Sequence, residues 1–339
     1  MKAVILAGGL GTRLRAVTGE HPKPMVPILG RPVMEHIVEL LRESAYTHIC
    51  AALHYRAGEI MAHFGDGRNF GVNMEYRIET ENLGTAGSVK NCRDFYGDDD
   101  FLVISADAAC DYDLRLLMES HKAHGAAATL ALCPQRTPLR YGLAVTDGKG
   151  YIRSFIEKPS WPRVVTDLVN TGIYVLSPRA MERVPEGPFD FGKELFPRLL
   201  KEGETLYGQV MEGYWRDIGT PQDYYRCCAD ALDGKLRLTP GGAFQQAQHE
   251  TAADSTEEGY ILSCDCEDRA RLMGTLSELM LDMGAEYDDG IRLKGKNYEL
   301  HISPSAVRSS VRIAVSSEDA EYARALCESA KNVAEKLNM

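Results

Sequence analysis

The sequence predicts an α/β protein with one large domain and a small α+β domain near its C-terminal end. Strand-like apolar segments alternate with helical segments over the first hundred residues, and the strand-like segments crowd together after residue 126. The length of 339 residues also exceeds what one hydrophobic core usually organises. Alternating strands and helices are typical of a mostly parallel sheet with helices on both faces. The closely spaced strands after residue 126 indicate that the sheet becomes mixed in the second half.

The chain begins with a buried strand and a glycine-rich turn. Residues 2–7 form a short apolar run that Gly8 and Gly9 close. A helix follows Pro32, where apolar residues recur at helical spacing and proline suits the first helical position. The remaining elements of the first half are expected at 47–53 (strand), 59–64 (helix), 72–78 (strand), 85–93 (helix) and 101–105 (strand).

The second half is predicted as mixed α/β, with a boundary near residue 238. Strands are expected at 126–133, 143–146, 151–156 and 169–176. Residues 238–259 have few large apolar groups and are predicted to be a linker. A strand at 260–263, a helix at 268–283, three short strands and a helix at 318–337 follow. We therefore expect domains at 1–237 and 260–339.

Composition excludes several classes of protein. With 44% apolar and 26% charged residues the chain has the make-up of a soluble globular protein, and its net charge of -11 argues against nucleic-acid or membrane partners. The N-terminal apolar run is too short for a signal peptide or a membrane span, so a cytoplasmic location is expected. The nine cysteines form no framework and are interpreted as small buried apolar residues. His121 and His124 have no evident third ligand and are expected on the surface.

The loop Gly8-Gly9-Leu10-Gly11-Thr12-Arg13 is the first candidate for chemistry. Glycines after a buried strand let backbone N–H groups approach phosphate oxygens closely. The loop is neither a dinucleotide-binding fingerprint, because Leu14 stands where its last glycine belongs, nor a P-loop. Arg13 and Lys23 then supply two cations that suit phosphate. The plainer alternative is a tight turn followed by solvated surface charges.

Longer motifs resemble a known family. LAGGLGTRL followed by PKPMVPI looks like the signature of sugar nucleotidyltransferases, and GTAGS, FIEKP, NTGIY and YWRDIGTP agree with it in order and spacing. The match covers residues 1 to about 235. PVMEH, GTAGSVKN, EKPSW and PFDFGKELFP are most similar to mannose-1-phosphate guanylyltransferases with a mutase-like C-terminal part. The resemblance implies a Rossmann-like (GT-A type) mixed sheet and two small-molecule substrates, a nucleoside triphosphate and a sugar 1-phosphate.

The resemblance also implies roles for individual residues. Asp107 and Asp217 would hold Mg²⁺, for which carboxylates are suitable hard-oxygen ligands, although aspartates at strand ends often cap turns instead. Asp111 and Asp113 are interpreted as helix-start residues. Arg13, Lys23, Asp107 and Asp217 form the expected catalytic set. The expected nucleotide-binding residues are Leu6, Ala7, Gly8, Gly9, Gly11, Thr12, Arg13, Lys23, Glu79, Gly84 and Thr85, and the expected sugar phosphate-binding residues are Gly142, Glu157, Lys158, Asn170, Thr171 and Gly172.

The base and the sugar are open at this point. Glu79 lies in the segment expected to contact the base, and a carboxylate can accept from both donors of guanine, which favours GTP. Glu81 could do the same. A glucose-1-phosphate enzyme that uses UTP or dTTP is the alternative within the class, and a non-catalytic regulatory relative is the alternative outside it. The joint retention of five residues argues against the latter: Arg13, Lys23, Asp107, Lys158 and Asp217.

The C-terminal residues resemble a different family. RARLMGTLSE, YDDGIRL and YELHISPS are similar to the last domain of phosphohexomutases, but Ser303 stands where an arginine is usual and the following loop is changed. Phosphate binding is therefore doubtful there, and mutase activity is excluded because the other mutase domains are missing. We expect this domain to tune or assemble the enzyme, with a homo-oligomer as the expected assembly.

Overall fold

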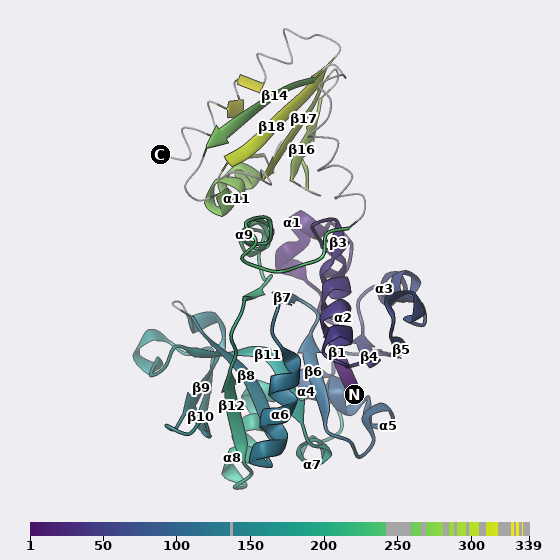
Figure 1. Cartoon of the computed structure of the whole chain (residues 1–339), viewed down its shortest axis with the longest axis vertical. Helices are drawn as coiled ribbons and strands as arrows, with labels where there is room; N and C mark the ends of the chain where they lie inside the picture. The colour runs from purple at the N-terminus through teal and green to yellow at the C-terminus, as the bar shows by residue number, and fades with distance from the viewer. Residues whose placement is uncertain are drawn as a thin grey trace. The chain divides into compact units, whose positions relative to one another are not determined.

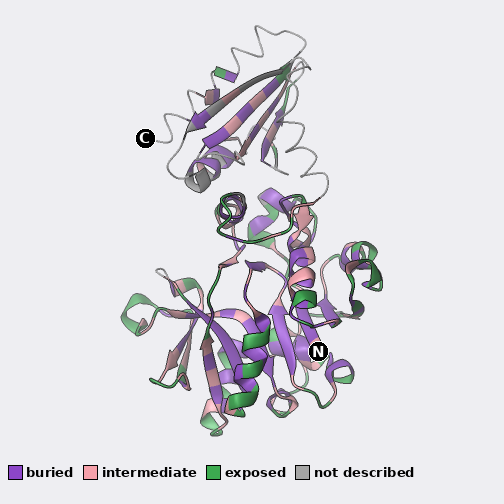
Figure 2. Ribbon diagram, viewed as in Figure 1, coloured by how far each residue is buried: buried purple, intermediate pink, exposed green. Residues whose placement is uncertain are grey.

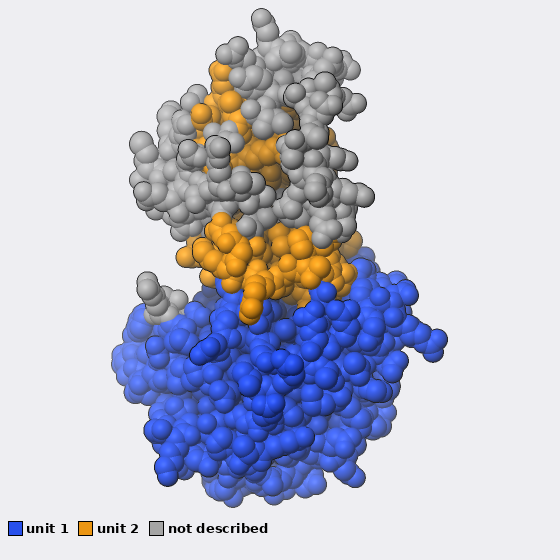
Figure 3. All heavy atoms as spheres, viewed as in Figure 1, with its two compact units in different colours: residues 1–10, 37–215 blue, residues 11–36, 216–339 orange. Residues whose placement is uncertain are grey.

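The structure is a computed structural model (Figure 1). It describes residues 1–135, 138–241, 259–265, 269–280, 285–287, 290–295, 298–304, 310–317, 327–328, 330–331 and 334. The chain divides into two compact units, residues 1–10 with 37–215 and residues 11–36 with 216–339 (Figure 3). Each unit is described in turn.

The first unit contains a nine-stranded mixed sheet. The order along its main path is β10-β9-β11-β6-β1-β4-β5, while β8 pairs with both β11 and β12. Strands β6, β1, β4 and β5 run parallel to one another, whereas β11 runs antiparallel to β6 and to β8. The nine strands are β1 (Lys2–Ala7), β4 (His48–Leu53), β5 (Asn73–Ile78), β6 (Phe101–Ser105), β8 (Ala128–Pro134), β9 (Gly142–Thr146), β10 (Ile152–Glu157), β11 (Leu168–Leu176) and β12 (Leu206–Val210). Strand β7 (Ala108–Cys110) belongs to a separate two-stranded sheet.

The central strands β1, β4 and β6 are apolar over most of their length because helices cover them. Val4 in β1, Cys50 in β4 and Val103 in β6 share one core with Ala86 and Val89 of helix α4, and the central strands are coloured as buried in Figure 2. Continuous apolar strands are expected of a parallel sheet covered on both faces. The helices of this unit are α3 (Ala57–Phe64), α4 (Gly84–Lys90), α5 (Arg93–Tyr96), α6 (Leu114–His124), α7 (Pro178–Met181), α8 (Phe196–Lys201), and the shorter turns η3 (Arg68–Phe70), η4 (Pro138–Arg140), η5 (Trp161–Arg163) and η6 (Phe191–Leu195).

The second unit contains a five-stranded antiparallel sheet in the order β14-β18-β17-β16-β15. Helix α11 contacts β16, β17 and β18 of this sheet. The sheet and its helix are formed by β14 (Gly259–Asp265), α11 (Arg269–Met280), β15 (Glu286–Tyr287), β16 (Ile291–Lys294), β17 (Tyr298–Pro304) and β18 (Ser310–Ser317). The earlier elements that begin in or belong to this unit are η1 (Thr12–Leu14), α1 (Arg15–Thr18), η2 (Lys23–Met25), β2 (Pro27–Ile28), β3 (Arg31–Pro32) and α9 (Pro221–Leu232). Helix α2 (Val33–Glu43) and strand β13 (Trp215–Asp217) cross the boundary between the units.

The predicted fold class is confirmed, with local differences. The predicted helix at 85–93 is two short helices, α4 and α5, and the three short strands expected after α11 are four, β15 to β18. Residues 242–258 of the expected linker and most of the expected final helix lie outside the described residues. No described helix is long and apolar enough to cross a membrane.

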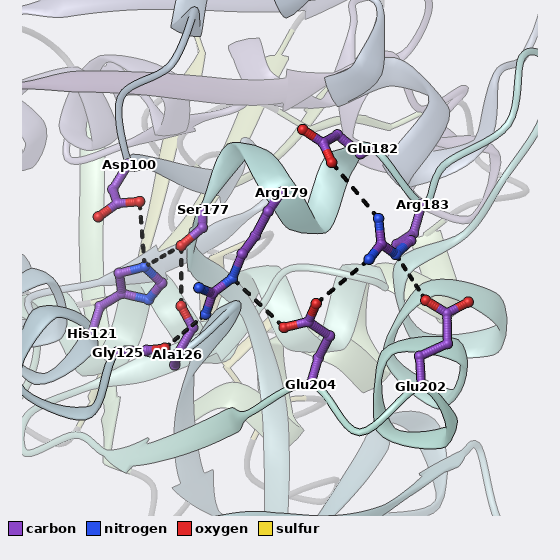
Figure 4. A network of polar contacts seen from close by, with 10 residues as sticks. All are labelled: Asp100, His121, Gly125, Ala126, Ser177, Arg179, Glu182, Arg183, Glu202 and Glu204. Carbon is purple, nitrogen blue, oxygen red and sulfur yellow. Dashed lines mark hydrogen bonds and ion pairs between the residues drawn. The ribbon is translucent and has the colours of Figure 1, made fainter.

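The expectation that His121 lies on the surface is wrong. Its ring is 2% exposed, with Nδ1 3.0 Å from Thr129 Oγ1 and Nε2 3.1 Å from Ser177 Oγ. Asp100 lies 3.7 Å from Nε2, and burial lowers the pKa of the histidine while Asp100 raises it (Figure 4). The ring therefore serves as a buried polar junction, where the hydroxyl groups of strand β8 and of Ser177 satisfy both nitrogens.

Candidate active site

The carboxyl ends of the four parallel strands carry the predicted nucleotide residues of the first unit. In the parallel register Ala7 lies beside Leu53, Leu53 beside Ile78 and Leu6 beside Ser105. Residues that follow these strands, Gly8, Glu79 and Asp107 among them, therefore leave the sheet at one edge. Open parallel sheets bind ligands at this edge, outside the carboxyl ends of the strands.

Glu79 is a buried carboxylate beside the glycine-rich loop. Glu79 is only 6% exposed. Its Oε1 atom has no hydrogen-bond partner in the described part of the chain. A Cβ added to Gly8 would lie 3.7 Å from Glu79 Oε2 and 3.4 Å from the Cβ of His54. Burial raises the pKa of Glu79, while Ser88, the Leu83 backbone and His54 lower it by less. An unpaired buried carboxylate oxygen is costly, so this atom is suited to accept from a ligand.

The backbone holds Glu79 firmly in place. Its N–H group donates to the Leu53 carbonyl at 2.7 Å, and its carbonyl oxygen lies 2.8 Å from His54 Nδ1. The first bond continues the parallel pairing of β4 and β5 past the end of the strands, and the second adds a side-chain contact from His54. The carboxylate is therefore presented by a rigid edge of the sheet rather than by a mobile loop.

Helix α4 begins with the predicted residues Gly84 and Thr85. The Gly84 N–H donates to Asn82 Oδ1 at 2.9 Å, and a Cβ on Gly84 would lie 2.6 Å from the Phe189 carbonyl oxygen. With a φ of +67°, this position requires glycine for two reasons, conformation and space. The Thr85 hydroxyl donates to Asp190 Oδ2 at 3.0 Å.

Asp107 follows β6 directly. The preceding residue, Ala106, is fully buried and its N–H donates to the Leu6 carbonyl at 2.9 Å, which attaches the Asp107 segment to the start of the glycine-rich loop. Asp107 itself is partly exposed. Asp113 caps helix α6 as predicted, since it accepts from the Arg115 N–H. Asp111 starts no helix; it accepts from the Tyr214 N–H at 2.7 Å.

The second unit holds the remaining loop residues and the predicted cations. Gly11 has a φ of +58°, and a Cβ there would lie 3.0 Å from Lys23 Cβ. Lys23 Nζ lies 3.6 Å from Asp217 Oδ1, with only 10% of the lysine side chain exposed. Thr12 and Arg13 are exposed in η1. The ion pair places one predicted phosphate-binding cation beside one predicted metal ligand.

The predicted sugar site centres on Glu157 at the end of β10. Cβ atoms added to Gly142 and Gly192 would lie 2.7 Å and 2.6 Å from Glu157 Oε2, so the carboxylate fits between two glycines. Burial raises the pKa of Glu157, and Lys158 lowers it by less. Lys158 has a positive φ of 42° and a side chain that is 63% exposed, with Nζ 4.0 Å from Glu157 Oε1. Its ammonium group can therefore reach an anion in solvent.

Strand β11 bulges where the other sugar-site residues lie. The pairing with β8 shifts between Asn170 and Tyr174. Asn170 donates to the Tyr174 hydroxyl at 2.8 Å and accepts from the Gly172 N–H at 3.1 Å. Thr171 is buried and its hydroxyl donates to the Ala131 carbonyl at 2.8 Å, so only its backbone is placed to contact a ligand. Trp215 donates to the Thr171 carbonyl at 3.0 Å and fixes the bulge further.

Comparison with known proteins identifies the family. The model of a family described as nucleotidyl transferase matches residues 2–234. The chain belongs to the nucleotidyl transferase family. It is 38% identical to a UTP–glucose-1-phosphate uridylyltransferase from Synechocystis over 70% of this chain and 65% of that protein. It is 34% identical to a mannose-1-phosphate guanylyltransferase from Mycobacterium tuberculosis over 86% of this chain and 78% of that protein.

A solved structure supports the same assignment. HddC from Yersinia pseudotuberculosis, complexed with GMP-PN, shares 32% identity and a TM-score of 0.59, covering 68% of this chain and 99% of that one. The match to the Synechocystis relative spans 65% of the length of that protein.

The two carboxylates predicted to hold Mg²⁺ in this nucleotidyl transferase are of the hard-oxygen type that this ion prefers. Asp107 and Asp217 are partly exposed carboxylates, one in each unit. Among the described residues no group of three or more His, Cys, Asp or Glu side chains is arranged to hold a metal. Mg²⁺ is commonly held by one or two carboxylates together with water and substrate phosphate oxygens, so a sparse donor set suits it.

Sequence reasoning missed several residues of this nucleotidyl transferase. Gly192 and Asp190 lie in PFDFGKELFP, a motif that indicates the family but in which the sequence predicts no site residue. Asp111 had been interpreted as a helix-start residue, and Trp215 had received no role. Gly192 could have been found from the sequence, because it is a glycine within a run of larger residues. The contact of Asp111 could not, because its partner Tyr214 lies 103 residues away.

Proposed function

We propose that this chain transfers a guanylyl group from GTP to mannose-1-phosphate, giving GDP-mannose and pyrophosphate. The choice of base rests on Oε1 of Glu79, which is buried and has no hydrogen-bond partner among the residues that the structure describes. Guanine offers two adjacent donors, its N1–H and its exocyclic amine, which match the two oxygens of a carboxylate. Uracil and thymine offer one N–H flanked by two carbonyl oxygens, and the second carboxylate oxygen would repel one of these.

The names of relatives support the same choice. Besides the Mycobacterium tuberculosis protein, a Saccharomyces cerevisiae protein named mannose-1-phosphate guanyltransferase is 37% identical over 66% of this chain. The neighbouring HddC structure contains GMP-PN. The Synechocystis uridylyltransferase supports a second candidate, transfer from UTP to glucose-1-phosphate. The two candidates differ at the base, which is where Glu79 makes its contribution.

The reaction requires little proton transfer from the protein. A sugar phosphate is close to a dianion at neutral pH, because its second pKa is about 6. One of its oxygens attacks the α-phosphorus; the new P–O bond forms while the bond to the β-phosphate oxygen breaks, and that electron pair leaves with pyrophosphate. Mg²⁺ held by Asp107 and Asp217 would supply charge neutralisation for the triphosphate.

The chain's own groups bind and orient the two substrates. Backbone N–H groups of residues 8–12 approach phosphate oxygens, and Arg13 and Lys23 offset negative charge during the transfer. Lys158 binds the sugar phosphate, while Glu157, fixed between two glycines, accepts from sugar hydroxyls. Catalysis therefore rests on positioning and electrostatic stabilisation.

A screen of pyrophosphate release tests the proposal. GTP, UTP, dTTP and ATP are each combined with mannose-1-phosphate and glucose-1-phosphate, using the full chain and Mg²⁺. The GTP and mannose-1-phosphate pair should give the highest kcat/KM. Faster reaction of UTP or dTTP with mannose-1-phosphate would make the guanine assignment wrong, and no turnover with any pair would favour a non-catalytic relative.

Two matched variants connect the result to the residue. Glu79→Gln should lower kcat/KM for GTP and narrow the preference over UTP, because an amide presents one donor and one acceptor. Glu81→Gln makes the same change of charge on an exposed neighbour and should leave the preference intact. If the preference for GTP over UTP changes in Glu81→Gln but not in Glu79→Gln, Glu81 is the residue that recognises the base.

A further inference from the structure

The segment from Gly187 to Lys193 contacts the nucleotide side of the site through its backbone. The Phe189 carbonyl accepts from the N–H groups of Ala86 at 2.9 Å and Gly87 at 3.1 Å, and the Phe189 N–H donates to the Leu83 carbonyl at 2.9 Å. The first turn of α4 thus directs its N–H groups at this segment. Cβ atoms at Gly84 and Gly87 would lie 2.6 Å from the carbonyl oxygens of Phe189 and Gly187, so the two backbones touch.

The carboxylate of Asp190 binds two different elements through its two oxygens. Oδ2 accepts from the Thr85 hydroxyl in α4 at 3.0 Å. Oδ1 accepts from the N–H groups of Gly192 at 2.9 Å and Lys193 at 3.0 Å, in the first turn of η6. The Thr85 hydroxyl in turn accepts from the Phe191 N–H at 2.9 Å. One half-buried side chain therefore fixes the spacing between α4 and η6.

The turn η6 also contacts Glu157 of the predicted sugar site directly. Gly192 lies against the Glu157 carboxylate, since an added Cβ would lie 2.6 Å from Oε2. Asp190 and Lys193 also act on Glu157 electrostatically, Asp190 raising its pKa and Lys193 lowering it. A shift of η6 by a few tenths of an ångström would therefore change where the carboxylate lies.

We propose that Asp190 is a positioning residue for both substrates, holding α4 for the nucleotide and η6 for the sugar phosphate. The inference rests on the proposed function only in requiring that both substrate classes bind. A cap of η6 is the simpler role for an aspartate at this position. That role explains the bonds from Oδ1 but leaves the bond from Thr85 to Oδ2 without a purpose.

Steady-state kinetics of variants separate these roles, using the substrate pair that the wild type turns over fastest. Asp190→Ala should raise both KM values roughly tenfold, since losing hydrogen bonds to a charged group commonly weakens an interaction by at least this much. Thr85→Val removes the bond to Asp190 Oδ2 and the bond from the Phe191 N–H but keeps both bonds to Asp190 Oδ1. It should raise the KM of the triphosphate more than that of the sugar phosphate. Asp190→Asn keeps an acceptor for η6 and a donor toward Thr85, and should restore most of the sugar phosphate KM.

Asp113→Ala is the matched control, because Asp113 caps α6 with the same chemistry away from these contacts. It should lower the melting temperature without moving either KM. An Asp190→Ala variant that melts earlier but keeps both KM values would show a cap and nothing more, and one that raises a single KM would overturn the two-sided role. A wild type that binds neither a triphosphate nor a sugar phosphate in calorimetric titration would instead contradict the proposed function, and this inference with it.

Discussion

Asp111 forms two hydrogen bonds with the backbone of Tyr214, one through its side chain and one through its own N–H group. Its Oδ1 atom accepts from the Tyr214 N–H at 2.7 Å, and its own N–H donates to the Tyr214 carbonyl at 3.2 Å. A Cβ on Gly213 would lie 2.6 Å from the same Oδ1, so the glycine makes room for the contact. Along the sequence, Asp111 closely follows Asp107 and Tyr214 closely precedes Asp217.

The first prediction follows from this contact. Asp111→Ala should destabilise the protein by roughly 1–3 kcal/mol, the usual cost of a lost partner for a partly buried N–H, and should lower turnover as well. Asp111→Asn keeps an oxygen acceptor and should lie close to wild type in both. Thermal unfolding and kcat/KM are measured for the pair. Equal losses in the two variants would mean that the negative charge matters rather than the hydrogen bond.

The second prediction concerns the proposed metal ligands. Asp107→Asn and Asp217→Asn should each reduce turnover at least ~10²-fold, as removal of a main electrostatic contact at a transition state commonly does, with folding preserved. Titration of Mg²⁺ with each variant adds a second measurement, because weaker metal affinity should accompany the loss. Near-normal turnover in both variants would remove these carboxylates from the mechanism.

A third prediction is the pH dependence of base choice. The pKa of Glu79 is raised, so its ionised form, which suits guanine, is lost as pH falls through that raised value. The KM of GTP should therefore rise on acidification more than that of UTP, because a protonated carboxyl can serve uracil as an amide would. Wild type and Glu79→Gln are compared across the pH range; a parallel response of the two would show that another group titrates.

The same pKa shift predicts an effect on stability. A carboxyl group with a raised folded pKa contributes stability at low pH, and this contribution is lost as pH rises through the folded pKa. Glu79→Gln removes the buried charge and should raise the melting temperature at neutral pH while weakening GTP use. Chemical denaturation at neutral pH checks this, and a destabilised variant would indicate that the carboxylate is better satisfied than its geometry shows.

The last prediction concerns the C-terminal residues. Arg31 donates to the Thr239 carbonyl at 2.9 Å and the Gly241 N–H donates to the Leu29 carbonyl at 2.9 Å, so a shortened chain should end after Gly241 rather than at Pro240. Turnover should persist in this fragment, while stability, oligomer size or response to a phosphosugar changes. Sedimentation and kinetics measure these properties. Loss of all activity in a fragment that still folds would mean that residues after 241 contribute to catalysis directly.

The sequence by itself determined the strands and the loop. Residues 3–7 are continuously apolar because the strand is covered on both faces, and a pattern of that kind can be recognised from a short stretch of sequence. The glycines after it and the two cations also stand within a short stretch of chain. Such local patterns are sufficient to predict the fold class, the family and the candidate residues.

Tertiary structure decided which side chains meet. Asp190 and Thr85 are 105 residues apart. The Oε1 atom of Glu79 has no hydrogen-bond partner among the described residues, and this follows from what surrounds it in the fold. His121 appears polar in sequence, yet neighbouring hydroxyl groups from another strand allow it to be buried. Contacts of this kind leave no periodic signal along the chain, since their free energy depends on desolvation and geometry that exist only once the sheet has formed.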